Sequence, residues 1–339
     1  MNMIMQIDNF SLKNYNTFGI EAFTKHYFSY SEISELLQYL KSSWKSELPF
    51  FILGGGSNIL FTKDYEGTII HPQNKGITII SEDSNSILVE VGAGEIWDDF
   101  VNWAVSNNFY GAENLSLIPG NIGASPIQNI GAYGVEACDI IHEVKTIEIQ
   151  TLRQKTFLNK ECEFGYRNSI FKNKELNKHI VTSVIYKLHK NESFKIEYGS
   201  IQKELAKYNK ITLSIVRETI ISIRNEKLPN PKEFGNAGSY FKNPVICIEH
   251  YHSLKNKFPD IISYPINESF VKIAAGWLIE ALGCKNMSVG GAKVHQKQAL
   301  VIINSDNATS NEIQELAKKI QQKVFNETQI TIEPEVIYL

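Results

Sequence analysis

The chain has 339 residues, of which 43% are hydrophobic and 21% charged, and its formal net charge at pH 7 is −3. These values are typical of a globular protein with two or three domains, and they exclude the strongly basic surface of a nucleic-acid-binding protein. The N-terminal residues lack the pattern of a signal peptide, and no hydrophobic run is long enough to span a membrane. We therefore expect a cytoplasmic protein that binds neither nucleic acid nor membranes.

The cysteine and histidine spacings predict no metal site. The four cysteines form no C-x-x-C pair, and no two histidines have the spacing of metal ligands. Reduced thiols in a cytosolic protein are the simplest interpretation. His295 is more typical of an ordinary polar residue than of a metal ligand.

The first 71 residues follow a mixed α/β pattern. Apolar residues recur at helical spacing between Ile33 and Trp44, and the run 50–53 predicts a strand. The motif GGGSN (residues 54–58) follows directly, before a second strand over 68–70. This order predicts a small lobe of the βαβ type.

A second, larger lobe is predicted from about residue 76. It contains a helix whose residues Ile96, Trp97, Phe100, Val101 and Ala104 form one apolar face. The helix lies between two pairs of strand-like runs. The predicted elements are a helix over 96–104 and strands over 77–80, 87–91, 144–149 and 180–188.

The third part of the chain begins near residue 228. Residues 224–239 contain two prolines, two glycines and no hydrophobic period, which is typical of a boundary. Thr309 and Glu312 predict a capping box at the start of one helix, whose inward residues would be Ile313, Leu316, Ala317, Ile320 and Val324. The predicted elements are helices over 273–282 and 312–325 and strands over 298–304 and 330–338.

Residues 119–134 (PGNIGASPIQNIGAYG) contain four glycines and two prolines, so they form neither an unbroken helix nor a central strand. Glycines let backbone N–H groups approach and surround an anion such as a phosphate. An isolated stretch of this kind is more often a loop whose glycines only make turns. The loop is long, carries several isoleucines and has a second glycine motif, GGGSN, upstream, which favours a ligand site. Neither motif fits the dinucleotide fingerprint or the phosphate loop.

Three further segments contain side chains suited to catalysis. Arg167 lies in FGYRNS and is able to clamp a carboxylate, although such an arginine is more often a solvated surface charge. Ser239 lies among small residues in GNAGSYFKNP, where a simple turn is the alternative. Glu333 and Glu335 share one face of the predicted final strand, where a buried glutamate would titrate near neutrality and a solvated one would not.

These motifs occur in one order, and together they closely resemble the UDP-N-acetylenolpyruvoylglucosamine reductases, the flavoenzymes that complete UDP-N-acetylmuramate in peptidoglycan synthesis. The resemblance covers about residues 16–336. Tyr133 and the segment Tyr198-Gly199 are similar to the longer-looped first type of the family. The motifs that carry the resemblance are GGGSN, PGNIGASPIQNIGAYG, FGYRNSIF, RNEKLPNPKEFGNAGSYFKNP, VKIAAGWLIE, GGAKVHQKQALVIIN and EPEV.

The resemblance implies an α+β protein. It would combine an FAD-binding fold of the vanillyl-alcohol oxidase (PCMH) type, in two lobes, with a C-terminal α+β domain that binds the UDP-sugar. The expected divisions are residues 1–75 with 329–339 for the first lobe, 76–228 for the second lobe and 229–328 for the substrate domain.

The resemblance also implies three sets of site residues. Arg167, Ser239 and Glu335 match the catalytic trio of the family. The chain departs from the family at two positions, because Ile337 stands where an arginine is common and Ala124 replaces a phosphate-facing serine of some members. The positions that match flavin-contacting residues are Gly54, Ser57, Asn58, Pro119, Gly120, Gln128, Gly131, Tyr166 and Arg224. The positions that match UDP-sugar residues are Tyr133, Tyr198, Lys227, Asn243 and Gln298. Of these, Tyr133 would close over the substrate.

The implied reaction reduces the enol ether of a UDP-linked amino sugar. Tightly but non-covalently bound FAD would carry hydride from NADPH to C3 of the enolpyruvyl group, since protein side chains do not supply hydride. Ser239 would deliver a proton to C2, helped by a nearby cation such as Lys227. Arg167 and Glu335 would stabilise the charge that develops at the carboxylate. We expect a monomer without a metal ion.

Three alternatives remain open from the sequence. The nearest is another FAD-dependent oxidoreductase of the same fold, whose flavin would be reduced by an alcohol instead of NADPH. A nucleotide-binding module without catalytic activity would yield a colourless protein. A serine hydrolase is disfavoured because Tyr240 and Phe241 follow Ser239, so that no G-x-S-x-G elbow is present.

Overall fold

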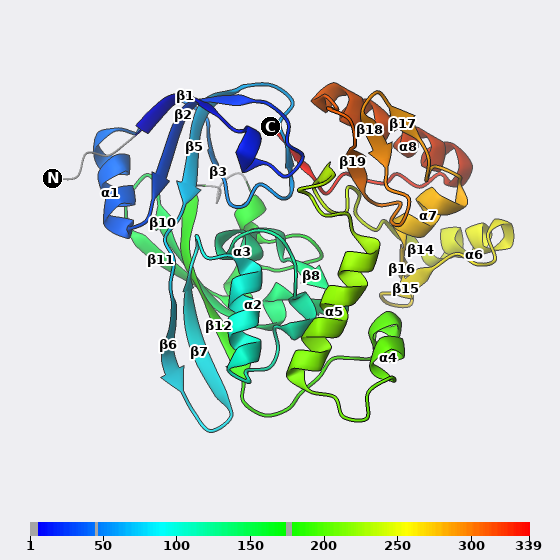
Figure 1. Ribbon diagram of the computed structural model, residues 1–339, viewed down its shortest axis with the longest axis horizontal. Helices are drawn as coiled ribbons and strands as arrows, with labels where there is room; N and C mark the ends of the chain where they lie inside the picture. The colour runs from blue at the N-terminus through cyan, green and yellow to red at the C-terminus, as the bar shows by residue number, and fades with distance from the viewer. Residues whose placement is uncertain (1–5, 45–46, 174–177) are drawn as a thin grey trace. The chain divides into compact units, whose positions relative to one another are not determined.

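The computed structural model describes residues 6–44, 47–173 and 178–339. The chain divides into two units, each made of several stretches (Figure 1). Unit 1 comprises residues 1–10, 24–55 and 66–224, and unit 2 comprises residues 11–23, 56–65 and 225–339.

The N-terminal part of unit 1 is a four-stranded sheet with one helix, α1 (Ile33–Ser42), packed against it. The side chains that α1 buries, Leu36, Tyr39 and Leu40, follow the helical period. The Tyr39 ring stacks on Phe28 with the ring centroids 3.8 Å apart. In spatial order the strands are β1 (Gln6–Ser11), β2 (Phe23–Tyr30), β5 (Tyr65–Pro72) and β3 (Phe50–Ile52).

The larger sheet of unit 1 has five antiparallel strands, with helix α2 (Trp97–Ser106) packed on it. Trp97, Phe100 and the central-strand residue Tyr186 form one buried aromatic cluster. The central strand β12 is buried along most of its length. The strand order is β11 (Gln154–Leu158), β10 (Ile141–Glu148), β12 (His179–His189), β7 (Ser86–Gly92) and β6 (Ile77–Glu82).

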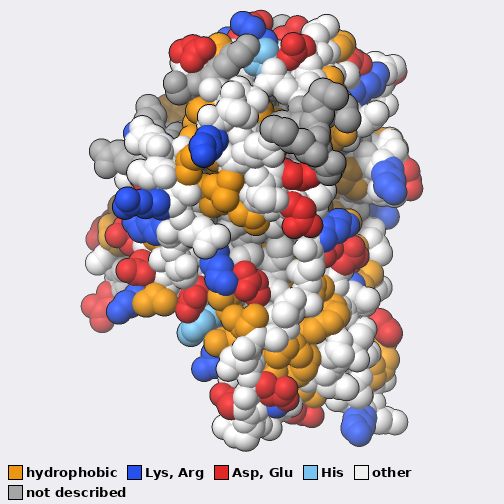
Figure 2. Space-filling model, turned by 90° about the vertical axis from the view of Figure 1, so that its left-hand side faces the viewer, with side chains coloured by type: hydrophobic (Ala, Val, Ile, Leu, Met, Phe, Trp, Pro, Cys, Tyr) orange, Lys and Arg blue, Asp and Glu red, His pale blue; other side chains and the backbone are white. Residues whose placement is uncertain are grey.

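Strand β6 forms one edge of this sheet. It lies in the lower half of Figure 1, and Figure 2 shows hydrophobic side chains on the surface in the lower half of the molecule. Ile79 and Ile80 are 42% and 46% exposed. A register shift between Ile79 and Ser81 interrupts the pairing with β7. Bulges of this kind twist an edge strand and reduce its ability to pair with another chain.

Unit 1 also contains short elements between α2 and β10 and, after β12, two further helices, α4 (Gly199–Leu205) and α5 (Leu213–Lys227). These helices share a small core of their own, built around Ile201, Val216 and Ile220. The short elements are α3 (Ser125–Gln128) and the hairpin β8 (Gly131–Ala132) with β9 (Val135–Glu136).

Unit 2 is built on a single core beneath helices α7 (Ala275–Ala281) and α8 (Ser310–Thr328). Two antiparallel sheets contribute to it, and helix α6 (Ile248–Lys257) contacts the smaller one. Strand β20 (Ile337–Tyr338) pairs in parallel with β4 (Ile59–Leu60). In spatial order, the larger of the two sheets contains β13 (Gly235–Asn236), β19 (Ile302–Asn304), β18 (Ala292–Val294) and β17 (Ser288–Val289). The smaller sheet contains β14 (Val245–Cys247), β16 (Phe270–Ile273) and β15 (Ser263–Pro265).

Most predicted helices and strands are confirmed. Helix α8 has the predicted capping box, in which Thr309 Oγ1 accepts a hydrogen bond from the Glu312 backbone N–H. Its inward residues follow the predicted period and are buried. Residues 119–134 contain only short elements, a 3-10 helix over Ile122–Ala124, α3 and β8, as their glycines and prolines require.

Four expectations were wrong in detail. The helix predicted to reach Trp44 ends at Ser42, and Ile96 is 44% exposed outside α2. The strand predicted over 298–304 contains only Ile302–Asn304. The final strand predicted over 330–338 contains only Ile337–Tyr338, because Pro334 has no N–H for a continuous ladder. The hydrophobic pattern determines which residues are buried, whereas the neighbouring strands available for hydrogen bonding determine where a strand begins and ends.

Candidate active site

The two glycine motifs of unit 1 approach each other backbone to backbone. A Cβ atom on Gly55 would lie 3.0 Å from the Gly120 Cα atom, and one on Gly123 would lie 3.0 Å from Ala93 Cβ. Gly120 O accepts a hydrogen bond from Trp97 N at 3.0 Å. A side chain at Gly55 would therefore separate the two loops, and one at Gly123 would push the second loop away from Ala93. The predicted flavin positions Gly54, Pro119 and Gly120 lie in these two loops.

An ion pair fixes the start of the second glycine loop. Asp98 accepts two hydrogen bonds from Arg217, at 2.7 Å from Nη1 and 2.9 Å from Nη2. Asp98 Oδ1 also accepts a bond from the Leu117 backbone N–H at 2.6 Å, and Leu117 has a φ of 58°. The pair thus joins α2, α5 and the segment that leads to Pro119. Sequence reasoning missed both residues.

Arg224 lies on α5 of unit 1 with its Nε atom buried and without a hydrogen-bond partner in the described part of the chain. Burial lowers the pKa of Arg224, while the nearby Tyr133 hydroxyl and Asp98 oppose that effect. Burial raises the pKa of Tyr133. An unpaired N–H on a buried cation is suited to an anionic ligand.

Tyr133 occupies the tip of the β8–β9 hairpin. Tyr133 and Gly134 have φ values of 50° and 81°, the sign required at both central residues of a two-residue type I′ turn. The Tyr133 and Tyr198 rings meet edge to face with centroids 5.6 Å apart. Asn114, which sequence reasoning missed, donates hydrogen bonds to the backbone oxygens of Tyr133 and Lys195. The structure thus brings Tyr133, Tyr198 and Arg224 together within unit 1.

Arg167 lies on a tight turn closed by two backbone hydrogen bonds of 3.0 Å between Gly165 and Asn168. Its φ is 54°, a left-handed conformation that is uncommon for arginine. The guanidinium donates hydrogen bonds to Gly131 O at 2.7 Å and to Asn129 O at 3.3 Å. Gln128 and Tyr166 adjoin this arrangement in the chain and are half-buried. Arg167 is thus held against the loop that contains Gly131.

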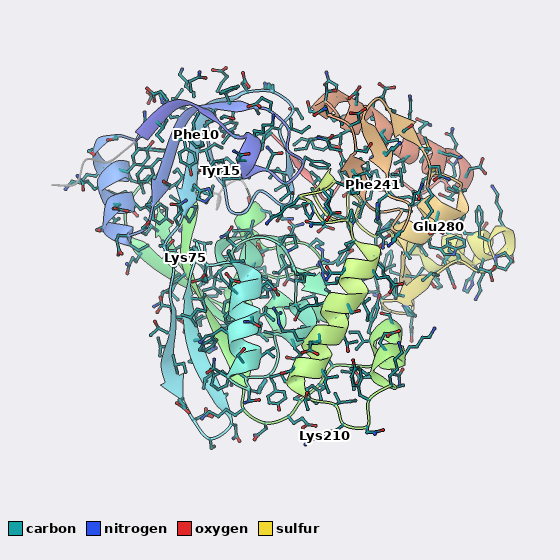
Figure 3. The ribbon with its side chains drawn as sticks, viewed as in Figure 1. Phe10, Tyr15, Lys75, Lys210, Phe241 and Glu280 are labelled. Carbon is teal, nitrogen blue, oxygen red and sulfur yellow. The ribbon has the colours of Figure 1, made fainter. Side chains whose placement is uncertain are left out.

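Ser239 and Glu335 lie on two segments of unit 2 that pair antiparallel. The Glu335 N–H donates to Tyr240 O at 2.8 Å, the Lys242 N–H donates to Glu333 O at 2.9 Å, and a bridge joins Phe241 to Pro334. Phe241, labelled in Figure 3, is buried. Ser239 and Glu335 are both half-buried. Two members of the predicted trio therefore come from neighbouring segments.

Two of the predicted UDP-sugar residues of unit 2, Asn243 and Gln298, lie near the same serine segment. The Tyr240 N–H donates to Leu300 O at 2.7 Å, two residues after Gln298 in the chain. Asn243 Oδ1 accepts a hydrogen bond from the Ala275 N–H at the start of α7. A Cβ atom on Gly276 would lie 3.1 Å from Gln298 Oε1. Lys227 is exposed.

The predicted flavin residues Ser57 and Asn58 belong to unit 2, and Asn58 contacts the C-terminal segment of that unit. Asn58 Nδ2 donates to Glu335 O at 3.2 Å, and the Ile337 N–H donates to Asn58 O at 3.0 Å. The position where the family often has an arginine, Ile337, is thus part of a strand. The predicted residues consequently form one group in unit 1 and one in unit 2.

The residues present fit a phosphate-containing cofactor. Gly55 is exposed and Gly54 and Gly120 are half-buried, and as glycines they have no side chain to keep a ligand from their backbone, while Arg224 offers a buried unpaired N–H. No group of three His, Cys, Asp or Glu side chains suited to a metal was found among the described residues. In the same part of the chain, no helix combines the length and the apolarity needed to cross a bilayer.

Family models match two parts of the chain. Residues 25–150 match an FAD binding domain, and residues 230–339 match the C-terminal domain of UDP-N-acetylenolpyruvoylglucosamine reductase. The crystal structure of a UDP-N-acetylenolpyruvylglucosamine reductase from Thermus caldophilus is similar, with a TM-score of 0.69 and 21% identity, covering 99% of this chain and 98% of that one. The predicted fold class, an FAD-binding fold of the PCMH type with a C-terminal domain, is confirmed.

Curated proteins named UDP-N-acetylenolpyruvoylglucosamine reductase match over nearly the whole chain. The relative from Flavobacterium johnsoniae is 51% identical over 97% of this chain and 98% of its own length. Those from Bacteroides fragilis and Neisseria gonorrhoeae are 44% and 41% identical, each over 97% of this chain and over 99% and 96% of their own lengths. The chain therefore belongs to the UDP-N-acetylenolpyruvoylglucosamine reductase family, and it is an FAD-binding oxidoreductase of peptidoglycan precursor synthesis.

Proposed function

We propose that the protein uses NADPH to reduce the enolpyruvyl group of UDP-N-acetylenolpyruvoylglucosamine and so forms UDP-N-acetylmuramate. The observation that carries the proposal is the pairing of the Ser239 and Glu335 segments, which gives one region of unit 2 a hydroxyl donor and a carboxyl group. The predicted UDP-sugar residues Asn243 and Gln298 flank the same region.

The glycine loops and Arg224 would hold FAD. Gly54 and Gly120 are half-buried glycines without side chains, which would let phosphates approach their backbone, and Arg224 would supply a positive charge. Ser57, Asn58, Pro119, Gln128, Gly131 and Tyr166 are the remaining proposed flavin residues. When bound, FAD supplies the hydride chemistry that side chains lack, accepting hydride from NADPH and passing it to C3 of the substrate.

Ser239 would donate the proton that completes the reduction. The C2–C3 double bond gains one hydride at C3 and one proton at C2, so a single acid is sufficient. An unperturbed hydroxyl is a weak acid, and we propose that the Lys227 cation favours its ionised form. Arg167 and Glu335 would stabilise the negative charge that develops towards the substrate carboxylate. Tyr133, Tyr198, Asn243 and Gln298 would bind the UDP-sugar.

The proposal is tested with Ser239→Ala in stopped-flow absorbance. NADPH should still reduce the bound flavin, because that step requires no proton from Ser239. Reoxidation by the enolpyruvyl substrate should be slower by about 100- to 10,000-fold, the usual contribution of one general acid. The exposed Ser288 of unit 2 provides the matched control, and Ser288→Ala should reoxidise at the wild-type rate. Wild-type reoxidation by Ser239→Ala would remove the serine from the mechanism.

We further propose a cytoplasmic monomer in three parts, with residues 1–75 and 329–339 and residues 76–228 forming the two flavin lobes and residues 229–328 the substrate domain. The match of residues 25–150 to an FAD binding domain supports the two flavin lobes, and the reductase C-terminal match that begins at residue 230 supports the start of the substrate domain. Sedimentation equilibrium at micromolar concentration should give the mass of one chain.

A further inference from the structure

We propose that Asn129 is a positioning residue that holds Arg167 in the orientation needed for reduction of the enolpyruvyl group. This inference rests on the proposed role of Arg167 as the group that binds the developing carboxylate charge. It concerns only contacts within unit 1. Asn129 is completely buried, and its φ of 45° places it in the left-handed region.

The Asn129 side chain connects three segments. Its Nδ2 donates hydrogen bonds to Gly165 O at 3.0 Å and to Glu136 Oε2 at 2.9 Å. Its Oδ1 accepts a bond from the Cys138 N–H at 3.0 Å. Both N–H donors and the oxygen of the amide are therefore used.

These bonds form a closed circuit around Arg167. Gly165 O is held by Asn129, and Gly165 also forms both hydrogen bonds that close the turn on which Arg167 lies. The Arg167 guanidinium in turn donates hydrogen bonds to Asn129 O and Gly131 O. The Asn129 side chain thus holds the turn that carries the Arg167 backbone, and the Asn129 backbone oxygen holds the Arg167 guanidinium.

Glu136 completes the arrangement across Gly131. A Cβ atom on Gly131 would lie 3.0 Å from both Arg167 Nη1 and Glu136 Cγ, so a side chain at this position would displace one of them. Gly131 pairs with Glu136 in the β8–β9 hairpin that carries Tyr133 at its tip. The same contacts therefore link the orientation of Arg167 to the hairpin of the proposed substrate residue Tyr133.

The variant Asn129→Asp tests the proposal, because it keeps the size of the side chain but removes both N–H donors and places a second carboxylate beside Glu136. We expect reoxidation of the reduced flavin by the substrate to slow about tenfold or more, since small displacements of a catalytic group have effects of this size. The rate of flavin reduction by NADPH should change by less than about twofold. The variant Asn129→Gly should slow reoxidation in the same way. Because glycine readily adopts a positive φ, backbone strain at this position would not explain the slowing.

A double-mutant cycle with Arg167→Ala separates positioning from a purely structural role. If Asn129 acts through Arg167, Asn129→Asp should have little further effect on reoxidation once Arg167 is absent, although it should still lower the melting temperature. Equal slowing in both backgrounds would overturn the proposal. If Asn129→Asp reoxidises at the wild-type rate while Arg167→Ala is slow, the positioning role of Asn129 is overturned and the role of Arg167 stands. If Arg167→Ala also reoxidises at the wild-type rate, the proposed role of Arg167 is overturned as well.

A matched control is available at Asn159 in the same unit. Its Nδ2 donates hydrogen bonds to Cys138 O and Ile141 O at 2.9 and 2.8 Å, atoms other than those that the Asn129 side chain bonds, although the Cys138 N–H is one of the latter. Asn159→Asp loses the same two donors and should lower the melting temperature with reoxidation at the wild-type rate. Slowing of reoxidation to the extent seen for Asn129→Asp would show that loss of any such amide suffices, which would overturn the proposal.

Discussion

At the scale of single residues, the Asp98–Arg217 pair connects stability to the flavin loop. The Arg217 and Asp98 side chains are only 9% and 24% exposed, so the pair is largely removed from water. A bidentate carboxylate–guanidinium contact also fixes direction as well as distance. Because Asp98 binds the Leu117 N–H, the pair orients the chain immediately before the proposed flavin residues Pro119 and Gly120.

Replacing Arg217 with methionine should lower the free energy of unfolding by about 2 kcal/mol, because it leaves a mostly buried carboxylate without its cation. The loss of the loop anchor should also weaken FAD binding. Urea denaturation and FAD titration of the apoprotein measure the two effects. The exposed pair Lys207–Glu204 is the control, since Lys207→Met should leave the free energy of unfolding nearly unchanged. Equal losses for the two variants would contradict the role of Arg217.

At the scale of elements, the paired segments around Ser239 and Glu335 are joined by a second contact. The Tyr240 and Tyr338 hydroxyl oxygens are 2.8 Å apart. The Tyr240 side chain is fully buried, whereas Tyr338 is 41% exposed. Leu339 O accepts hydrogen bonds from the backbone and side chain of Thr62 at 2.6 and 2.7 Å. Side-chain and backbone contacts thus fix the segment that carries Glu335.

We expect Tyr338→Phe to lower the free energy of unfolding by about 1 kcal/mol, because the buried Tyr240 hydroxyl loses its partner. The double variant Tyr240→Phe/Tyr338→Phe removes both hydroxyls and should recover much of this loss. Thermal denaturation of the two single variants and the double variant measures the coupling energy. Purely additive effects would show that the hydroxyl contact does not stabilise the paired segments.

The same tyrosine pair predicts a pH dependence. Burial raises the pKa of both Tyr240 and Tyr338 above the ordinary value. Above about pH 10 the unfolded chain therefore releases protons that the folded protein retains, so the stability of the folded state falls as pH rises. The double phenylalanine variant should lose less stability between neutral pH and alkaline pH than the wild type. Urea midpoints at several pH values provide the measurement.

At the scale of the whole molecule, the proposed flavin residues are divided between the two units. Gly54, Pro119 and Arg224 belong to unit 1, whereas Ser57 and Asn58 belong to unit 2. A ligand that binds only the folded state stabilises every part whose folding its binding requires. On the proposed assignment, FAD should therefore stabilise the folded state of each unit that contains residues binding it.

Hydrogen exchange with and without FAD tests this expectation. Amides in the glycine loop of unit 1 and in the segment around Asn58 of unit 2 should both exchange more slowly when FAD is bound. At an FAD concentration 100 times its dissociation constant, the gain in unfolding free energy should be about 2.7 kcal/mol. Protection confined to unit 1 would contradict the assignment of Ser57 and Asn58 as flavin residues. An exposed helix such as α6 serves as an internal reference.

The sequence by itself determined the family, the fold class and the identity of most helices and strands. Hydrophobic period is a local property, so it was sufficient to predict the inward face of α8 and the strands of the larger sheet. Glycine and proline likewise indicate loops from their own backbone preferences, as in residues 119–134. The motifs that carry Arg167, Ser239 and Glu335 were recognisable for the same reason, since each is contiguous in the chain.

Only the tertiary structure decided which of these residues meet and what holds them. Asn129 and Glu136 support Arg167, and Asp98 meets Arg217 119 residues away. The left-handed conformations of Tyr133 and Arg167 were also not predictable, because neither residue favours them and the surrounding hydrogen bonds impose them. Contacts between distant segments depend on the packing of the whole unit, which no local pattern of residues encodes.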